Sequence, residues 1–255
     1  MTRARRHMRG ARQLRLFILA VQFLTRLRTP QIHDFRPEDL SRSAVFFPLV
    51  GVIVGTVIAA LVWTFALVTP AVGALAGVIA WVWVTGGLHL DGLGDVADAL
   101  GASHRDPQRF QEVLRDPHVG AFGVMAITLQ IASKLVLLSA LPIAASPIAL
   151  VLVPAWARWG TLVWSRALAS LSAGMAERFS WRIGLGAIGG WGAALTIVSA
   201  WACPALLVSL VVVLLIALYW QRRLGGISGD CLGASVEVME SVLLLAVAVA
   251  AAGRV

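Results

Sequence analysis

Three aspartates with helical spacing offer the clearest chemistry in the sequence. Asp91, Asp95 and Asp98 follow one another at intervals of four and three residues, which places all three on one face of a helix. Carboxylates that share a face repel one another and need a positive charge nearby. Hard oxygen ligands at this spacing suit Mg²⁺, which also takes phosphate oxygens. The stripe predicts a magnesium site, with His89 beside it as a ligand, a base or a structural donor; the alternative is an acidic helix end paired with loop arginines.

A charged loop follows about 20 residues after the stripe. It reads R-D-P-H-V-G-A-F-G over 115–123. Backbone N–H groups near Gly120 can face an anion at the start of a helix. Arg115 would add a positive charge and Asp116 a further carboxylate. On its own, this segment also suits an ordinary loop.

A third segment combines glycines with acidic residues. It reads G-G-I-S-G-D-C-L-G over 225–233. Gly226 and Gly229 indicate a loop that wraps closely around something, and Asp230 supplies a carboxylate. Glu237 follows Asp230 by seven residues and shares its face if the two lie on one helix.

The three segments together contain the chemical groups that phosphoryl transfer requires. Their carboxylates can hold a metal, their arginines can contact phosphates, and their glycines can admit a ligand to the backbone. The sequence contains no Walker loop of the form G-x-x-x-x-G-K-[ST]. A nucleotide would therefore be part of a substrate, held by its diphosphate.

The composition places these segments in a membrane protein. Of the 255 residues, 59% are hydrophobic and 13% are charged, against about 25% charged in ordinary soluble domains. So few polar residues cannot cover a soluble surface, and a disordered chain needs low hydrophobicity. We therefore predict an all-α polytopic helical bundle.

Seven segments are long and apolar enough to span a membrane, namely 43–69, 71–90, 119–141, 147–165, 183–201, 204–220 and 235–253.

The basic residues predict the domains and the orientation. The formal net charge is +8, which points to anionic lipid headgroups; we expect no nucleic acid, because that partner needs a soluble basic face. Residues 1–42 would form a basic segment with an amphipathic helix on the membrane surface, and 43–255 a single transmembrane catalytic domain. With the N-terminus inside, 18 of the 21 basic residues lie in cytoplasmic segments.

This orientation also places all three acidic segments on the cytoplasmic side. It predicts a multi-pass protein of a bacterial-type cytoplasmic (inner) membrane whose active site faces the cytoplasm. A homo-oligomer is left open. Lys134 lies inside the third predicted span, where a lysine is costly unless it is paired or faces water. We therefore expect it to face the interior of the bundle, with Glu237, Glu240 or a substrate phosphate as its partner.

In order and spacing, the three segments resemble the signature of the cobalamin synthase family, adenosylcobinamide-GDP ribazoletransferase. Residues 86–100 read G-G-L-H-L-D-G-L-G-D-V-A-D-A-L, close to the usual G-G-x-H-x-D-G-L-A-D-T-x-D-G. Residues 115–123 and 225–234 resemble the second and third motifs, and 22–26 and 47–51 are weaker echoes. The departures remove no carboxylate; they are Gly94, Val96, Ala99 and His118.

The resemblance implies a defined reaction. The family joins adenosylcobinamide-GDP to α-ribazole or its 5′-phosphate, giving adenosylcobalamin or its 5′-phosphate and GMP, and it requires Mg²⁺. The ribazole 3′-hydroxyl would attack the phosphate on the cobinamide side. Asp91, Asp95 and Asp98 would hold Mg²⁺ against the diphosphate. The implied catalytic residues are His89, Asp116 and Asp230, with Asp230 as a further ligand or a base. The implied binding residues are Arg115, Gly120, Gly226, Gly229 and Glu237.

Two other functions stay open at this stage. A CDP-alcohol phosphotransferase also uses stacked aspartates on a membrane helix, but its usual D-x-x-D-G pattern is absent. An ion transporter would place acids near the middle of spans, often at broken helices. Here the acids stand at the predicted cytoplasmic ends beside glycine loops.

Overall fold

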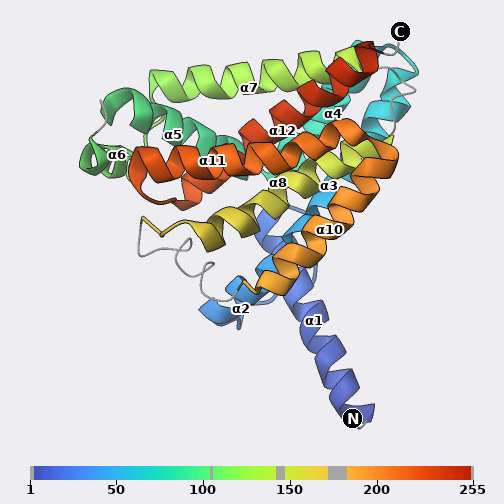
Figure 1. Ribbon diagram of the computed structural model, residues 1–255, viewed down its shortest axis with the longest axis vertical. Coiled ribbons are helices and arrows are strands. Elements are labelled where there is room, and N and C mark those ends of the chain that lie inside the picture. Colours follow the sequence, from blue (N-terminus) through green and yellow to red (C-terminus); the bar gives the residue numbers. More distant parts are fainter. Residues whose placement is uncertain (1–2, 104–105, 142–146, 172–182, 254–255) are drawn as a thin grey trace.

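The computed structural model describes residues 3–103, 106–141, 147–171 and 183–253. Within these ranges the chain is helical, and its only β-type pairing is a single bridge between Ser170 and Ile227. The predicted all-α bundle is confirmed (Figure 1). The α-helices are α1 (Arg3–Leu24), α2 (Pro37–Ser43), α3 (Phe47–Ala66), α4 (Pro70–Thr85), α5 (Leu88–Ser103), α6 (Pro107–Val113), α7 (Ala121–Ala140), α8 (Pro147–Ala167), α10 (Leu185–Ala202), α11 (Ser209–Leu224) and α12 (Gly229–Ala252).

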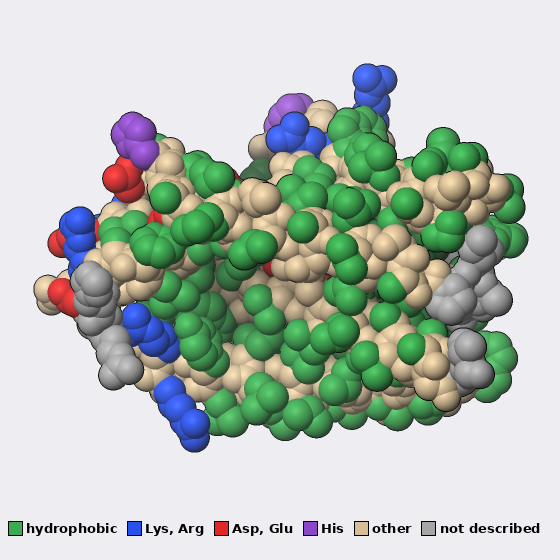
Figure 2. Space-filling view, turned by 90° about the horizontal axis from the view of Figure 1, so that it is seen from above, with side chains coloured by type: hydrophobic (Ala, Val, Ile, Leu, Met, Phe, Trp, Pro, Cys, Tyr) green, Lys and Arg blue, Asp and Glu red, His purple; other side chains and the backbone are tan. Residues whose placement is uncertain are grey.

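Membrane-spanning helices make up most of the described chain. Six segments are long and apolar enough to cross a membrane: Glu38–Ala66, Ala121–Ala140, Pro147–Ala167, Leu185–Ala202, Pro204–Leu224 and Gly229–Ala252. A bent pair, α4 with α5, gives a seventh if it counts as one span. Hydrophobic side chains cover most of the face seen in Figure 2, and charged side chains gather mainly at its left end. The last span begins at Gly229 rather than at the predicted 235.

The second predicted span, 71–90, is not one straight helix, because a sharp bend divides it. α4 ends at Thr85, and Gly86 and Gly87 have φ of 65° and 75°, a left-handed region that glycine enters without strain. α5 then leaves at 87° to α4. The aspartates are on a helix as predicted, but this helix does not continue the line of the span before it.

Small residues allow the central helices to pack closely. A Cβ atom added at Gly51 of α3 would lie 2.5 Å from the carbonyl oxygen of Pro154 in α8, and one at Gly55 would lie 2.6 Å from that of Val151. Contact through small residues is the usual way for membrane helices to approach. α12 packs against both α5 and α8, so α8 and α12 connect the aspartate helix to the core.

The N-terminal helix is present as predicted. The last turns of α1 bury Leu19, Val21 and Leu24 against the bundle, while the rest of the helix extends away from it (Figure 1). Just beyond α1, the backbone N–H of Arg26 donates to the carbonyl oxygen of Val84 at 2.8 Å. This bond holds the segment after α1 next to the end of α4. The location of α1 on a membrane surface stays a prediction.

Candidate active site

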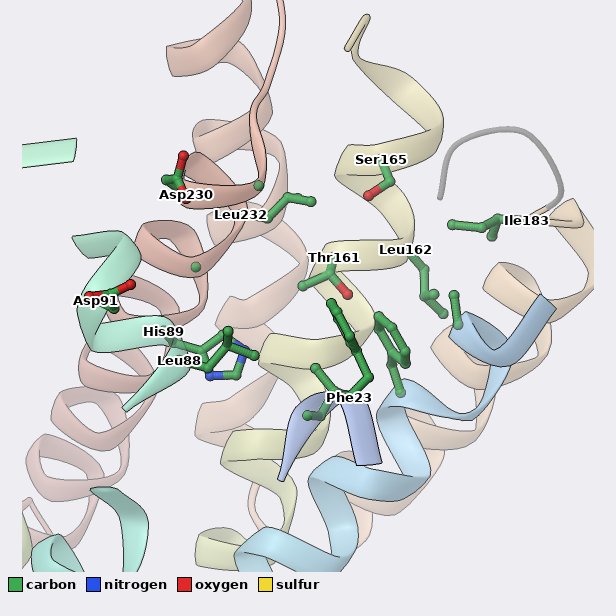
Figure 3. A pocket seen from close by; sticks show the side chains of 15 residues that line it. Phe23, Leu88, His89, Asp91, Thr161, Leu162, Ser165, Ile183, Asp230 and Leu232 are labelled. Atoms are coloured by element: carbon green, nitrogen blue, oxygen red, sulfur yellow. The ribbon is translucent and has the colours of Figure 1, made fainter. Parts of the chain in front are cut away.

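The first and third acidic segments meet at one cavity. Asp91 of α5 and Asp230 of α12 both line a cavity of about 180 Å³ (Figure 3). The helices approach through glycine, because a Cβ at Gly92 would lie 2.9 Å from the carbonyl oxygen of Asp230. The sequence segments that carry most of the predicted chemistry are therefore neighbours in the fold.

The rest of this cavity is aromatic and aliphatic, and we call it the aromatic cavity. Phe23 and Phe47 stack on one side, with ring centroids 5.9 Å apart and an angle of 13° between the planes. Thr161 and Ser165 bring two hydroxyl groups from α8. In Figure 3 the two aspartates lie at the left, across the cavity from the α8 hydroxyls. The remaining lining residues are Leu24, Ala44, Leu88, His89, Leu162, Ile183, Gly229, Leu232 and Gly233.

A second, larger cavity adjoins the first. It measures about 620 Å³ and shares Phe23, Leu88 and Asp91 with the aromatic cavity. Its other walls are more polar, and we call it the arginine cavity because Arg26 is the only basic side chain among its lining residues. The other lining residues are Gln22, Thr25, Thr85, Gly86, Gly87, Leu90 and Ile127. Sequence reasoning missed Arg26 as a site residue, although the weak similarity at 22–26 was a signal.

The members of the aspartate stripe differ in their contacts. Asp91 is exposed and Asp95 is partly buried. Asp98 is anchored: its Oδ2 accepts a hydrogen bond from the backbone N–H of Gly120 at 2.7 Å, and its Oδ1 accepts one from that of Gly123 at 2.9 Å. Asp98 thus satisfies free N–H groups at the start of α7. This contact brings Gly120 of the second segment against the stripe.

Asp91, Asp95, Asp98 and Asp230 form a negatively charged cluster without a basic side-chain partner in the described residues. Across the described ranges, no ion pair involves Asp91, Asp95, Asp98 or Asp230, and Asp95 experiences the charge of the other three. In the same ranges, no three His, Cys, Asp or Glu side chains are arranged to hold a metal ion by themselves. The arrangement fits Mg²⁺, which binds through one or two carboxylates and completes its shell with water and substrate phosphates.

The charged loop contributes less to the cavities than its motif suggests. Arg115 and Asp116 are exposed, and neither lines the aromatic or the arginine cavity. Asp116 Oδ1 accepts a hydrogen bond from the backbone N–H of His118 at 3.0 Å and lies 2.7 Å from its Nδ1. These hydrogen bonds lower the pKa of Asp116. The structure therefore brings Gly120, but not the loop's charged side chains, to the aspartates.

The third segment is divided between the cavity and the bundle interior. Gly226 lies directly against the backbone of Ala169, whose carbonyl oxygen accepts a hydrogen bond from the N–H of Ile227 at 2.8 Å. Gly229 and Asp230 line the aromatic cavity. Glu237 is on the same helix as Asp230, as predicted, but is buried away from either cavity.

Four charged side chains form a cluster inside the bundle, which we call the ionic cluster. Lys134 Nζ lies 2.7 Å from Glu237 Oε2 and 2.6 Å from Glu240 Oε2, so its predicted interior position and partners are confirmed. Nζ also lies 4.2 Å from the ring centroid of Trp81. Arg158 completes the cluster, with Nη1 2.5 Å from Glu240 Oε1. The pairing of Arg158 was missed, although an arginine inside an apolar span is itself a signal.

The comparisons with known proteins agree on one family. A family model described as cobalamin-5-phosphate synthase matches residues 16–248. A relative from Thiobacillus denitrificans, named adenosylcobinamide-GDP ribazoletransferase, is 49% identical over 236 residues, covering 91% of this chain and 94% of the relative. Relatives of the same name from Novosphingobium aromaticivorans and Laribacter hongkongensis are each 51% identical, covering 92% and 93% of this chain and 97% and 98% of their own lengths. No solved structure matches the chain.

Proposed function

The chain belongs to the cobalamin-5-phosphate synthase family, and on that premise we propose that it joins adenosylcobinamide-GDP to α-ribazole or its 5′-phosphate, with Mg²⁺ and with release of GMP. One observation carries this proposal. Asp91 and Asp230, from segments far apart in the sequence, line the same cavity. A carboxylate pair at a cavity between apolar walls suits the transfer of a phosphoryl group to an uncharged hydroxyl.

The transfer itself exchanges one phosphorus–oxygen bond for another. The 3′-hydroxyl oxygen of ribazole attacks the phosphorus attached to the cobinamide side. The bond from that phosphorus to the bridging oxygen breaks, and GMP leaves with the electron pair. Asp230 would take the hydroxyl proton, a role supported by its position in the lining of the aromatic cavity together with Asp91. His89 is almost fully buried and lines the same cavity, and it would orient this hydroxyl or take its proton in place of Asp230.

The stripe would supply the metal site. Asp91 and Asp95 would hold Mg²⁺, whose positive charge offsets the charge of the diphosphate when it is bound. Asp98 has one lone pair left on each oxygen after its bonds to Gly120 and Gly123, so it can complete the site or position the other two. Arg115 and Asp116 would meet parts of the corrinoid substrate that extend beyond the cavities.

The remaining predicted site residues have supporting roles in this proposal. Gly229 and Gly226 shape the backbone beside Asp230. Glu237 would act from the ionic cluster, which lies about two turns further along α12 than Asp230. Given the distribution of arginines in the sequence, we place the site on the cytoplasmic side of the inner membrane, with the basic helix α1 against anionic lipid headgroups.

The test is a reaction with purified components. Protein in detergent is given adenosylcobinamide-GDP with either α-ribazole or its 5′-phosphate, and the GMP and corrinoid products are separated by chromatography across a Mg²⁺ titration. With at least one of the two acceptors we expect equal amounts of GMP and the corrinoid product, adenosylcobalamin or its 5′-phosphate, and no product after chelation of the metal. Failure to form either product at any Mg²⁺ concentration would exclude the proposed reaction. A CDP-alcohol and a lipid acceptor serve as the control substrate pair.

The ionic cluster argues against the ion-transporter alternative. That function calls for acidic side chains inside spans that are free to bind a cation. Glu240 is instead held by both Lys134 and Arg158, and Glu237 by Lys134. Two carboxylates and two basic groups cancel in charge, so the cluster offers no free cation site.

A further inference from the structure

The two adjoining cavities differ in size, polarity and charge. The aromatic cavity, at about 180 Å³, is below the roughly 300–1,000 Å³ of pockets that enclose a whole drug-sized ligand. The arginine cavity, at about 620 Å³, falls within that range. Phe23, Leu88 and Asp91 form the boundary between them. A reaction between two bound molecules needs such a shared boundary, with one reactant on each side.

We propose that the two cavities divide the substrates: the aromatic cavity binds the aromatic base of the nucleoside acceptor, and the arginine cavity binds the diphosphate of the nucleotide-activated donor through Arg26. This inference rests on the proposed function and adds to it a binding location for each substrate. Asp91, on the shared boundary, then lies where the acceptor hydroxyl meets the phosphorus.

The walls of the aromatic cavity suit an uncharged ring system. The stacked rings of Phe23 and Phe47 and the side chains of Leu162 and Ile183 favour a flat aromatic ligand through apolar burial and ring contacts. A corrinoid or a whole nucleotide exceeds this volume. The base can therefore enter while its ribose stays at the aspartate side.

Arg26 is positioned to hold a phosphate. Its backbone is fixed by the bond to Val84, and its side chain lies directly against Gly86, at a point where a Cβ atom would collide with it. The side chain is exposed, and the described residues include no ion-pair partner for it. Arginine binds phosphate oxygens in a bidentate manner.

The charge balance strengthens this assignment. Carboxylates alone repel a diphosphate, so a cavity that contains Asp91 needs positive charge to accept one. Arg26 is the basic residue that lines the arginine cavity. The aromatic cavity is lined by no lysine or arginine, so a diphosphate placed there would lack a basic side chain to bind its oxygens.

The experiment compares two variants, each of which is expected to raise the KM for a different substrate. Arg26→Gln is expected to raise the KM for adenosylcobinamide-GDP about 10- to 100-fold, the usual effect of losing a hydrogen bond to a charged group, with the KM for α-ribazole unchanged. Arg26→Lys keeps the positive charge but loses the bidentate guanidinium group. Its KM for adenosylcobinamide-GDP is therefore expected to lie between those of the unchanged protein and Arg26→Gln. Ser165→Leu fills the aromatic cavity and is expected to raise the KM for α-ribazole about 10-fold or more, with the donor KM unchanged.

Matched controls separate these effects from changes in surface or folding. Arg28→Gln removes an exposed arginine two residues from Arg26, and Ala167→Leu adds the same side chain at an exposed position of α8; both are expected to keep both KM values. If Arg26→Gln raised the α-ribazole KM, or if both site variants raised the same KM, the division of substrates would be wrong while the proposed reaction stood.

A binding measurement on the unchanged protein needs neither turnover nor a folded variant. GMP and α-ribazole are titrated by calorimetry, each alone and each with the other at saturation. The proposal expects both to bind at once. Mutually exclusive binding, or no binding of either probe, would overturn it. If both probes bind together, with Arg26→Gln weakening only the binding of GMP and Ser165→Leu weakening only that of α-ribazole, but the protein forms no product, the division of the cavities stands and the proposed reaction fails.

Discussion

Lys134 and Glu240 are 106 residues apart in the chain, yet their side chains meet at 2.6 Å inside the bundle. This contact joins α7 to α12, and Glu240 in turn joins α12 to α8 through Arg158. The cluster thus connects three helices, about two to three turns along α12 from Asp230. Loss of one of its charges leaves a buried partner without compensation, which is far more costly than removal of a surface pair.

We therefore expect Lys134→Met to destabilise the protein by about 3–5 kcal/mol. The cause is the negative charge left on Glu237 and Glu240, of which Arg158 can balance only one. The double variant Lys134→Met with Glu237→Gln restores neutrality and is expected to recover a large part of the loss. Thermal unfolding in detergent measures both effects. A double variant no more stable than Lys134→Met would show that charge balance is not the reason.

The orientation yields a prediction about the two ends of the chain. An odd number of spans, with the bent pair α4 and α5 counted as one, places the ends on opposite sides. Since the arginine-rich segments favour a cytoplasmic N-terminus, reporter fusions are expected to show the N-terminus inside and the C-terminus outside. Both ends on the same side would mean that α4 and α5 do not cross together.

The helices and the ionic pairing of Lys134 were accessible from the sequence for physical reasons. Runs of apolar residues identify spans because a membrane leaves few alternatives for them. Lys134 could be assigned an interior position because an unpaired charge in a span is too costly, and only a few acidic residues were available as partners.

Features that depend on three-dimensional approach were not accessible. Gly86 and Gly87 were read as part of one apolar span, because the 87° bend follows from their backbone conformation rather than from any periodicity. Asp98 looked equivalent to Asp91 and Asp95, since its distinguishing contacts come from a loop more than 20 residues away. The role of Arg26 depends on how the segment after α1 packs against the end of α4.

The exposed pair Asp116 and His118 gives a prediction about pH. Hydrogen bonds from His118 lower the pKa of Asp116. The ionised carboxyl therefore stabilises the folded loop at a pH above the unfolded pKa, and this stabilisation is lost as the pH falls through the folded pKa. His118→Ala is expected to raise the pKa of Asp116 towards its ordinary value of about 3.9, as measured by a carbon-detected NMR titration. Because the pair lies outside both cavities, the acid limb of the pH–rate profile is expected to stay in place; a parallel shift would give Asp116 a direct catalytic role.

Asp98 is expected to behave as an anchor. Asp98→Ala leaves the N–H groups of Gly120 and Gly123 without their acceptors, at a cost of about 1–3 kcal/mol in stability. Hydrogen exchange at the start of α7 is expected to accelerate, and added Mg²⁺ is not expected to restore turnover. Full recovery at high Mg²⁺ would instead mean that Asp98 acts mainly as a metal ligand.

The last prediction concerns Asp91 and Asp95 as metal ligands. Replacing either with Asn preserves the shape but removes a negative charge and one good oxygen ligand, so folding is expected to survive. Turnover is expected to fall at least about 100-fold, on the order of 3 kcal/mol of transition-state stabilisation, and higher Mg²⁺ is expected to restore part of it. Asp106→Asn is the matched control: Asp106 accepts a hydrogen bond from the N–H of Gln108 at 2.9 Å as the N-cap of α6, and asparagine caps a helix equally well. Near-normal turnover of both stripe variants at limiting Mg²⁺, with the control equally active, would rule out a metal site at Asp91 and Asp95.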